Sequence, residues 1–146
     1  MVKKSGSGKE YEALVEAIIE RSCKMNKLAK KGQSNVGEKP GGGNHIIDWE
    51  LWEEDNPSKR ALLSCKIQTT AGTAEEKIAY EVVKLLHTMD FDPRFRFGWI
   101  VLGGNGWNNG LLDYYLKELP TRIPSMVGRI QILRTDDLIS LNLIIP

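Results

Sequence analysis

Apolar residues at helical spacing mark two long segments of the chain. From residue 9 to residue 23 they recur at i, i+3, i+4, i+7 and i+8, which is typical of an amphipathic helix. A second helix is predicted from Thr73, because Thr73 and Glu76 form a capping box and a wide apolar stripe follows. Two shorter helices are predicted nearer the C-terminus, from "NNGLLDYYLKEL", which Pro120 ends, and from "TDDLISLNL".

Between these helices, apolar runs and alternating positions predict four strands. In "IIDWELW" apolar residues alternate with acids, so Ile47, Trp49 and Leu51 should share one face. Asp48 and Glu50 should face the opposite way. "RALLSCKIQ" should pair with this strand as a hairpin, "FRFGWIVLGG" is apolar enough to be central, and "GRIQILR" is the fourth strand.

The glycine-rich segment "KKGQSNVGEKPGGGNH", residues 30–45, shows neither period and is predicted to be a loop. The order of elements is then α-β-β-α-β-α-β-α. This order favours an α/β fold, a mixed β-sheet flanked by helices on both faces. Since the chain has 146 residues and no linker-like segment, residues 1–146 should form a single domain.

Composition and charge narrow the class of protein. Residues are 41% hydrophobic and 27% charged, and no apolar run approaches the roughly 18–20 residues that span a bilayer, so no membrane contact is expected. Two cysteines give no disulfide framework, which favours the cytoplasm. The net charge is only +1, yet residues 24–31 contain four lysines. These lysines suit phosphate contacts and a solvated helix face equally well.

The segment "LLSCKIQ", residues 62–68, raises the question of function. Alternation places Ser64, Lys66 and Gln68 on one face of its strand. If the strand pairs with the preceding one, Asp48 meets this face. A carboxylate beside a lysine is either a structural ion pair on an edge strand or part of a site.

The following helix can bring a second acid to this face. Glu75 lies in its first turn, where the helix dipole also favours an acid. Glu81 lies at the flank of the apolar stripe, from which it can reach the edge of the sheet. Glu81 is therefore the better candidate.

Two acids and a lysine have a clear chemical use. Carboxylate oxygens can hold Mg²⁺, which polarises a phosphate and acidifies a bound water. A lysine can orient or deprotonate the attacking water and offset charge on the phosphate. Asp48, Lys66 and Glu81 thus meet the requirements of metal-dependent phosphodiester hydrolysis.

This arrangement resembles the PD-(D/E)XK nuclease superfamily, which has the restriction-endonuclease-like fold. Residues 9–102 are similar to its core in the order of helix, Asp48 strand, "SCK" strand and helix. The chain departs from the pattern at Ser64, where an acid is expected two residues before the lysine. A subset of restriction endonucleases is similar in this respect, with D…S-x-K and the acid moved into the next helix, ahead of a pattern like "EVVKLL". If the acid has not moved, Glu75 or Gln68 must complete the site.

The resemblance implies roles for individual residues. Asp48 and Glu81 would be metal ligands, and Lys66 would be the catalytic lysine. Gln68 would act beside them, as in members with a glutamine near the metal. Glu12, on the first helix, resembles an acid that some members place near the metal.

The resemblance also implies a Mg²⁺-dependent DNA endonuclease, most similar to restriction enzymes, in which Mn²⁺ can replace Mg²⁺. A homodimer is expected, because one site cuts one strand and two-fold DNA sites suit two-fold proteins. The DNA backbone would be approached by the lysine cluster and the glycine-rich segment, at Lys30, Lys31, Lys39 and Asn44.

Other functions of the same fold remain open. The same chemistry would serve a Holliday junction resolvase, a homing endonuclease or a repair nuclease. Ser64, which stands where an acid is expected, motivates a different class, a non-catalytic nucleic-acid-binding module.

Overall fold

The computed structural model describes residues 2–68, 77–104, 106, 107, 109–140 and 142–146. The helices are α1 (Val2–Asn26), α2 (Lys77–Phe91), α3 (Asn109–Arg122), the 3₁₀ helix η2 (Pro124–Met126) and α4 (Thr135–Ile139). The strands are β1 (Leu28–Glu38), β2 (Asn44–Glu53), β3 (Asn56–Ile67), β4 (Phe95–Gly103) and β5 (Ile130–Arg134).

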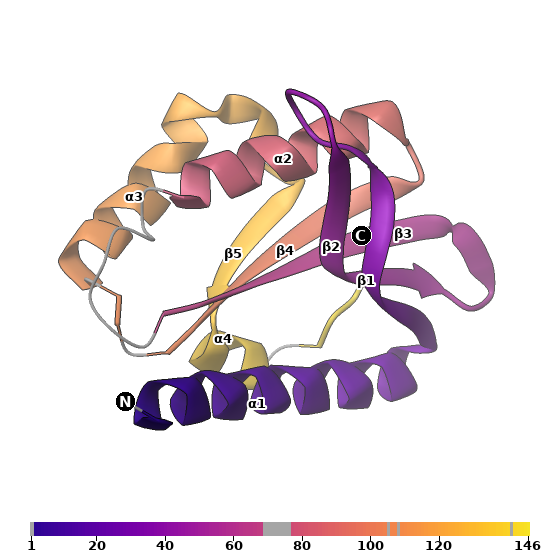
Figure 1. Cartoon of the computed structure of the whole chain (residues 1–146). Helices are drawn as coiled ribbons and strands as arrows, with labels where there is room; N and C mark the ends of the chain where they lie inside the picture. Colours follow the sequence, from indigo (N-terminus) through magenta and orange to yellow (C-terminus); the bar gives the residue numbers. More distant parts are fainter. Residues whose placement is uncertain (1, 69–76, 105, 108, 141) are drawn as a thin grey trace.

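The described strands form one mixed sheet in the order β1-β2-β3-β4-β5. β1, β2 and β3 are antiparallel neighbours, whereas β3, β4 and β5 run parallel. α2 and α3 cover one face of the sheet, and α1 and α4 cover the other (Figure 1). The predicted α/β fold, a mixed sheet flanked by helices on both faces, is confirmed.

Two apolar clusters fill the spaces between the sheet and its helices. The first joins α2 and α3 to sheet residues such as Leu62 and Ile100. The second joins α1 and α4 to the opposite sheet face, including Leu63 and Val101. Neighbouring residues of β3 and β4 therefore enter different clusters, as strand geometry requires.

The loop prediction for residues 30–45 was wrong over most of its length. β1 occupies Leu28–Glu38 and pairs with β2, and only a short turn remains between the two strands. This turn carries Gly41, Gly42 and Gly43, all with positive φ. β1 is an edge strand, and its buried residues are Leu28 and Ser34 alone. A strand that buries so little shows no apolar period, so the pattern of a loop and that of a polar edge strand coincide.

The prediction of regular alternation in β2 was also wrong. Ile47 packs in the cluster under α2, whereas Trp49 and Leu51 pack on the α1 side. The buried side chains of β2 therefore change from the α2 face of the sheet to the α1 face between Ile47 and Trp49, that is, at Asp48. Across the ladder from this point, Gln33 of β1 has a positive φ of 48°. A local irregularity of this kind turns a side chain out of its expected face.

Helix ends differ from the sequence prediction by a few residues. α1 extends on both sides of 9–23, and α3 continues past Pro120 to Arg122. A proline near the C-terminus of a helix removes one hydrogen bond only, and Ile123 still donates to the carbonyl of Leu119. The predicted capping box of Thr73 and Glu76 lies outside the described residues.

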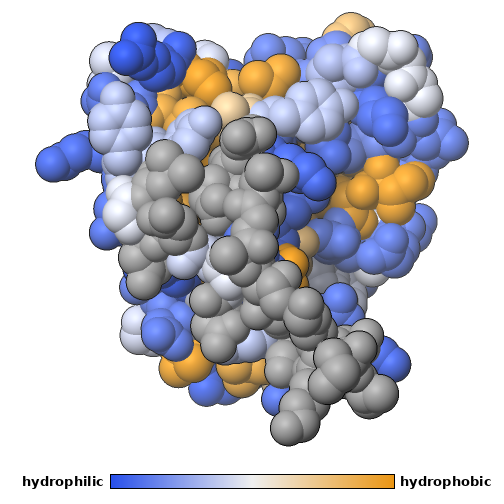
Figure 2. All heavy atoms as spheres, turned by 60° about the vertical axis from the view of Figure 1, so that its left-hand side comes forward, coloured by the Kyte–Doolittle hydropathy of each residue, from blue (hydrophilic) through white to orange (hydrophobic). Residues whose placement is uncertain are grey.

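On the face seen in Figure 2, apolar residues form separate patches among polar and charged ones. No described helix is both long enough and apolar enough to cross a membrane.

Candidate functional site

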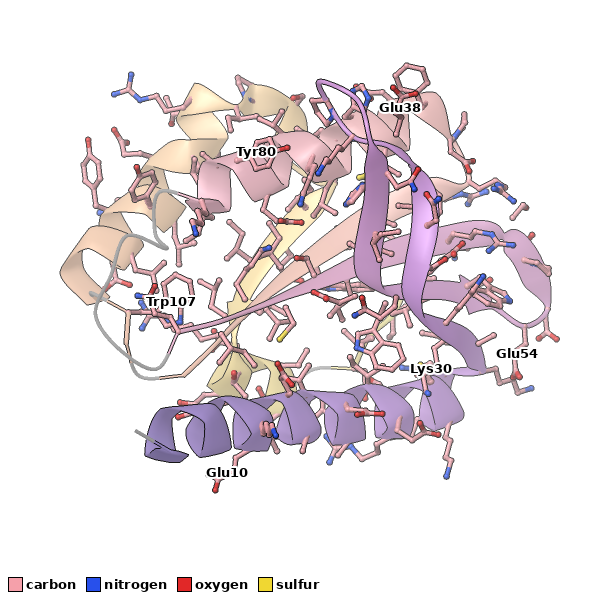
Figure 3. The ribbon with its side chains drawn as sticks, in the orientation of Figure 1. Glu10, Lys30, Glu38, Glu54, Tyr80 and Trp107 are labelled. Atoms are coloured by element: carbon pink, nitrogen blue, oxygen red, sulfur yellow. The ribbon has the colours of Figure 1, made fainter. Side chains whose placement is uncertain are left out.

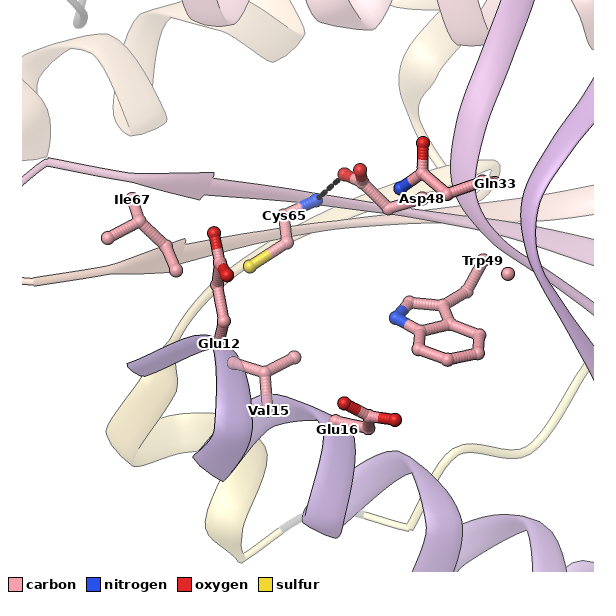
Figure 4. A pocket seen from close by; sticks show the side chains of 9 residues that line it. Glu12, Val15, Glu16, Gln33, Asp48, Trp49, Cys65 and Ile67 are labelled. Carbon is pink, nitrogen blue, oxygen red and sulfur yellow. Dashed lines mark hydrogen bonds between the residues drawn. The ribbon is translucent and has the colours of Figure 1, made fainter. Parts of the chain in front are cut away.

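Asp48 lies where β2 separates from β3. The pairing of these strands begins with Trp49 opposite Leu63 and runs from there toward the turn. Beside this first pair, Oδ2 of Asp48 accepts a hydrogen bond of 2.7 Å from the backbone N–H of Cys65, as the dashed line in Figure 4 shows. A half-buried carboxylate is thus fixed in the opening between two strands.

A cavity of about 410 Å³ opens beside this carboxylate, between α1 and the strands β1, β2 and β3. Glu12 and Glu16 line it from α1, and Gln33 lines it from β1 (Figure 4). The structure therefore brings Glu12 to the same cavity as Asp48. Its role as a metal ligand stays a prediction.

Lys66 projects from β3 toward α2, on the opposite side from Cys65. Its Nζ lies 3.0 Å from Oε1 of Glu81, and the two side chains are 39% and 3% exposed. The structure thus brings together the lysine and the acid that the sequence analysis preferred. Ser64, one pleat earlier on the same face of β3, is buried.

A second lysine shares the Glu81 carboxylate. Nζ of Lys84 lies 3.2 Å from the same Oε1, and its side chain is 18% exposed. The ammonium also lies 5.4 Å from the centre of the Tyr80 ring. Lys84 was not predicted from the sequence, although its spacing of three residues from Glu81 places both on one helix face.

The two ammonium groups keep Glu81 ionised. Burial alone would raise the pKa of Glu81, but the charges and hydrogen bonds of Lys66 and Lys84 outweigh burial and lower the pKa from its usual value. His45, whose Nδ1 lies 2.7 Å from Oγ1 of Thr88, adds no charge here. Burial, reinforced by Lys84, lowers the pKa of His45, so the imidazole is neutral at neutral pH.

These carboxylates suit a hard divalent cation. Within the described residues, no three His, Cys, Asp or Glu side chains come close enough together to hold a metal by themselves. Mg²⁺ needs only one or two carboxylates, because it keeps several waters and binds phosphate oxygen of the substrate. In the described part of the chain, Oδ1 of Asp48 accepts no hydrogen bond and so has ligand capacity. Glu81 would have to leave a lysine to act as a second ligand.

Gln68 has a structural role that was not predicted from the sequence. Its side-chain amide donates to the carbonyl of Gly106 at 2.7 Å, and its own backbone carbonyl accepts from the N–H of Gly106. Gly104, two residues before Gly106, has φ +88°, and an added Cβ there would collide with the Gln68 carbonyl oxygen. Gln68 therefore connects the end of β3 to the turn after β4. Its catalytic role stays a prediction.

The residues predicted to contact DNA lie on the β1–β2 hairpin. Lys30 is paired, because its Nζ lies 3.0 Å from Oε2 of Glu20 and 5.0 Å from the centre of the Trp49 ring. Figure 3 shows Lys30 directed toward α1. The remaining candidates are exposed: Lys31, Lys39 and Asn44. The alternative acid, Glu75, lies outside the described residues.

A model of a known protein family matches most of this chain. Residues 7–143 match the model described as a PD-(D/E)XK nuclease superfamily domain, and this range contains the Asp48 opening, Lys66 and Glu81. No curated protein matches the chain. Because the match covers nearly the whole sequence, the chain belongs to the PD-(D/E)XK nuclease superfamily.

Proposed function

We propose that this chain is a Mg²⁺-dependent endonuclease that hydrolyses phosphodiester bonds in DNA, in the manner of a restriction enzyme. The observation that carries the proposal is the position of Asp48. Its carboxylate binds the N–H of Cys65, and the next residue of β3 is Lys66, whose ammonium contacts a buried acid. Asp48 and Lys66 thus lie close to the point where β2 separates from β3. Membership of a nuclease superfamily supports the same class of reaction.

Each residue has a distinct task in this proposal. Asp48, with Glu81 or Glu12 as second ligand, would hold a divalent cation, which when bound would supply Lewis acidity to the scissile phosphate and lower the pKa of a bound water. Asp48 is oriented before substrate arrives, because its hydrogen bond to Cys65 fixes the carboxylate. Lys66 offsets the charge that grows on the phosphoryl oxygens. The water oxygen bonds to phosphorus and gives up a proton to solvent. The bond from phosphorus to one sugar oxygen breaks, and that oxygen takes a proton from solvent and leaves as an alcohol.

Plasmid cleavage tests the assignment. Supercoiled plasmid is incubated with the protein and Mg²⁺, beside Asp48→Ala, Lys66→Ala and Lys117→Ala, an exposed lysine on α3 that serves as control. We expect the first two variants to cut about 100-fold more slowly or worse, since each removes a charge at the reacting phosphate. Undiminished cleavage by Asp48→Ala and Lys66→Ala would contradict the site.

Metal removal tests the cofactor. We expect EDTA to abolish cleavage, added Mg²⁺ to restore it, and Mn²⁺ to replace Mg²⁺, because all the proposed ligands are oxygen atoms. Cleavage that continues in excess EDTA at the Mg²⁺-stimulated rate would rule out the metal dependence.

The choice of substrate separates enzymes that share this chemistry. A restriction-type homodimer cuts a plasmid into discrete fragments, because two sites act on the two strands of a two-fold target. A junction resolvase would instead prefer four-way junctions to linear duplex. Sedimentation of the protein with and without its DNA measures whether two copies assemble.

Ser64 favours a second candidate function. It is buried at the strand position where an acid would stand, so β3 supplies no carboxylate where the family pattern has one. A non-catalytic nucleic-acid-binding module would bind duplex or single-stranded DNA without cutting any substrate in Mg²⁺ or Mn²⁺.

A further inference from the structure

The pairing of Glu81 is unusual in having two cations on one oxygen. Oε1 lies 3.0 Å from Nζ of Lys66 and 3.2 Å from Nζ of Lys84. One ammonium group is enough to balance one carboxylate. The second lysine therefore needs a reason beyond charge balance.

The two lysines differ in how firmly they are held. Lys66 belongs to β3, and its side chain is the more exposed of the two. Lys84 belongs to the same helix as Glu81, one turn away, and its ammonium packs against the Tyr80 ring. Figure 3 shows Tyr80 on α2. Lys66 is the lysine that can leave, and Lys84 is the one that stays.

Movement of Lys66 away from Glu81 would destabilise the folded protein if Glu81 had no other cationic partner. Removing one member of a buried ion pair leaves an uncompensated charge out of water, which strongly destabilises the fold. The nearby imidazole of His45 is neutral and cannot replace the lost cation. In the described part of the chain, Glu81 is also the only carboxylate that Lys84 contacts.

We propose that Lys84 is a positioning residue for the nuclease reaction, which keeps Glu81 paired and oriented while Lys66 moves to the phosphate. This inference rests on the proposed function, because it assumes that Lys66 serves a phosphodiester. Lys84 also competes with a divalent cation for the Glu81 carboxylate. Its removal should therefore tighten metal binding and at the same time slow the reaction.

A stability cycle on the metal-free protein tests the shared pairing. Lys66→Met and Lys84→Met each leave Glu81 one ammonium, so each variant alone should melt close to the wild type. The double variant should melt about 5–10 °C lower than the sum of the single effects predicts. Adding Glu81→Gln to the double variant should remove most of this excess, because no charge is then left unpaired. Simple additivity of the two single effects would overturn the proposal.

Metal binding and cleavage together test the positioning role. Titration of the protein with Mn²⁺ alone should show Lys84→Met binding about 3-fold to 10-fold more tightly than the wild type, because a nearby positive charge is gone. The kcat of Lys84→Met should fall about 10-fold to 100-fold, since the Glu81 carboxylate is no longer oriented. Lys84→Arg, which keeps the charge, should restore most of the rate, and Lys117→Met should match the wild type. A loss of packing alone would slow cleavage without tightening Mn²⁺ binding, and that result would overturn the inference.

The two proposals fail in different ways. If the wild type cuts no DNA, the proposed nuclease function fails, while the melting cycle and the Mn²⁺ titration still report on Lys84. If the wild type cuts and Asp48→Ala does not, but Lys84→Met behaves like Lys117→Met, the function stands and the role of Lys84 is refuted.

Discussion

Glu81 makes the stability of the protein depend on pH. Because Lys66 and Lys84 overcome the effect of burial, its pKa in the folded protein lies below the usual value of 4.5. A carboxyl with a lowered folded-state pKa contributes stability that is fully present above the unfolded value and is lost as the pH falls through the folded one. We expect the wild type to lose more thermal stability than Glu81→Gln between about pH 6 and about pH 3. Parallel losses in the two proteins would show that Glu81 has no such role.

Cys65 offers a second measurement at the scale of one residue. Burial, reinforced by the charge of Asp48, raises the pKa of its thiol to about 12, and burial raises that of Cys23 to about 11. The thiolate is the reactive form, so both groups should react slowly with a disulfide reagent in the native protein at about pH 8. Both should react fast in denaturant. Rapid reaction of one thiol in the native protein would show that its surroundings are open.

Some features of the site and of the strands could be predicted from the sequence, and others could not. The contact of Lys66 with Glu81 was predictable from strand alternation in β3 and the flank of a helix stripe, which depend on local sequence only. The catalytic roles of Asp48, Lys66 and Glu81 stay predictions. The face exchange at Asp48 was not predictable, because it follows from the register between β1 and β2. β1 itself was missed for a related reason: an edge strand gains its order from pairing with β2, and its own residues bury little.

The turn that follows β4 shows how one residue can decide the geometry of an element. The sequence pattern indicates a tight turn there, and Gly104 adopts φ +88° against the backbone of Gln68. Gly104→Ala should lower the free energy of unfolding by about 2–4 kcal/mol, because a Cβ adds a collision to a strained backbone. Urea unfolding measures this.

Gly128→Ala is the matched control for that substitution. Gly128 also has a positive φ, of +76°, but an added Cβ would meet nothing within 4 Å. It should therefore cost only about 1 kcal/mol, from backbone strain alone. Equal effects at the two glycines would show that the contact with Gln68 does not matter.

At the scale of the whole molecule, the sheet lies between two apolar clusters. Each cluster stabilises the fold from its own side of the sheet. Ile19 of α1 lies in one cluster and Ile78 of α2 in the other, and both are fully buried. Each substitution to valine should cost about 0.5–1.5 kcal/mol. Because the sheet lies between them, the double variant should show the sum of the two costs within about 0.5 kcal/mol.

Two residues in the same apolar cluster provide the contrasting double-mutant cycle. Ile78 and Val82 are one turn apart on α2 and share the cluster under that helix. Ile78→Val with Val82→Ala should depart from additivity, because the two cavities merge and the neighbouring side chains relax once for both. Urea unfolding of the singles and doubles measures both cycles. If Ile19 and Ile78 couple as strongly as Ile78 and Val82, the two faces of the sheet are not mechanically separate, and changes near α1 would reach the Glu81 side of the site.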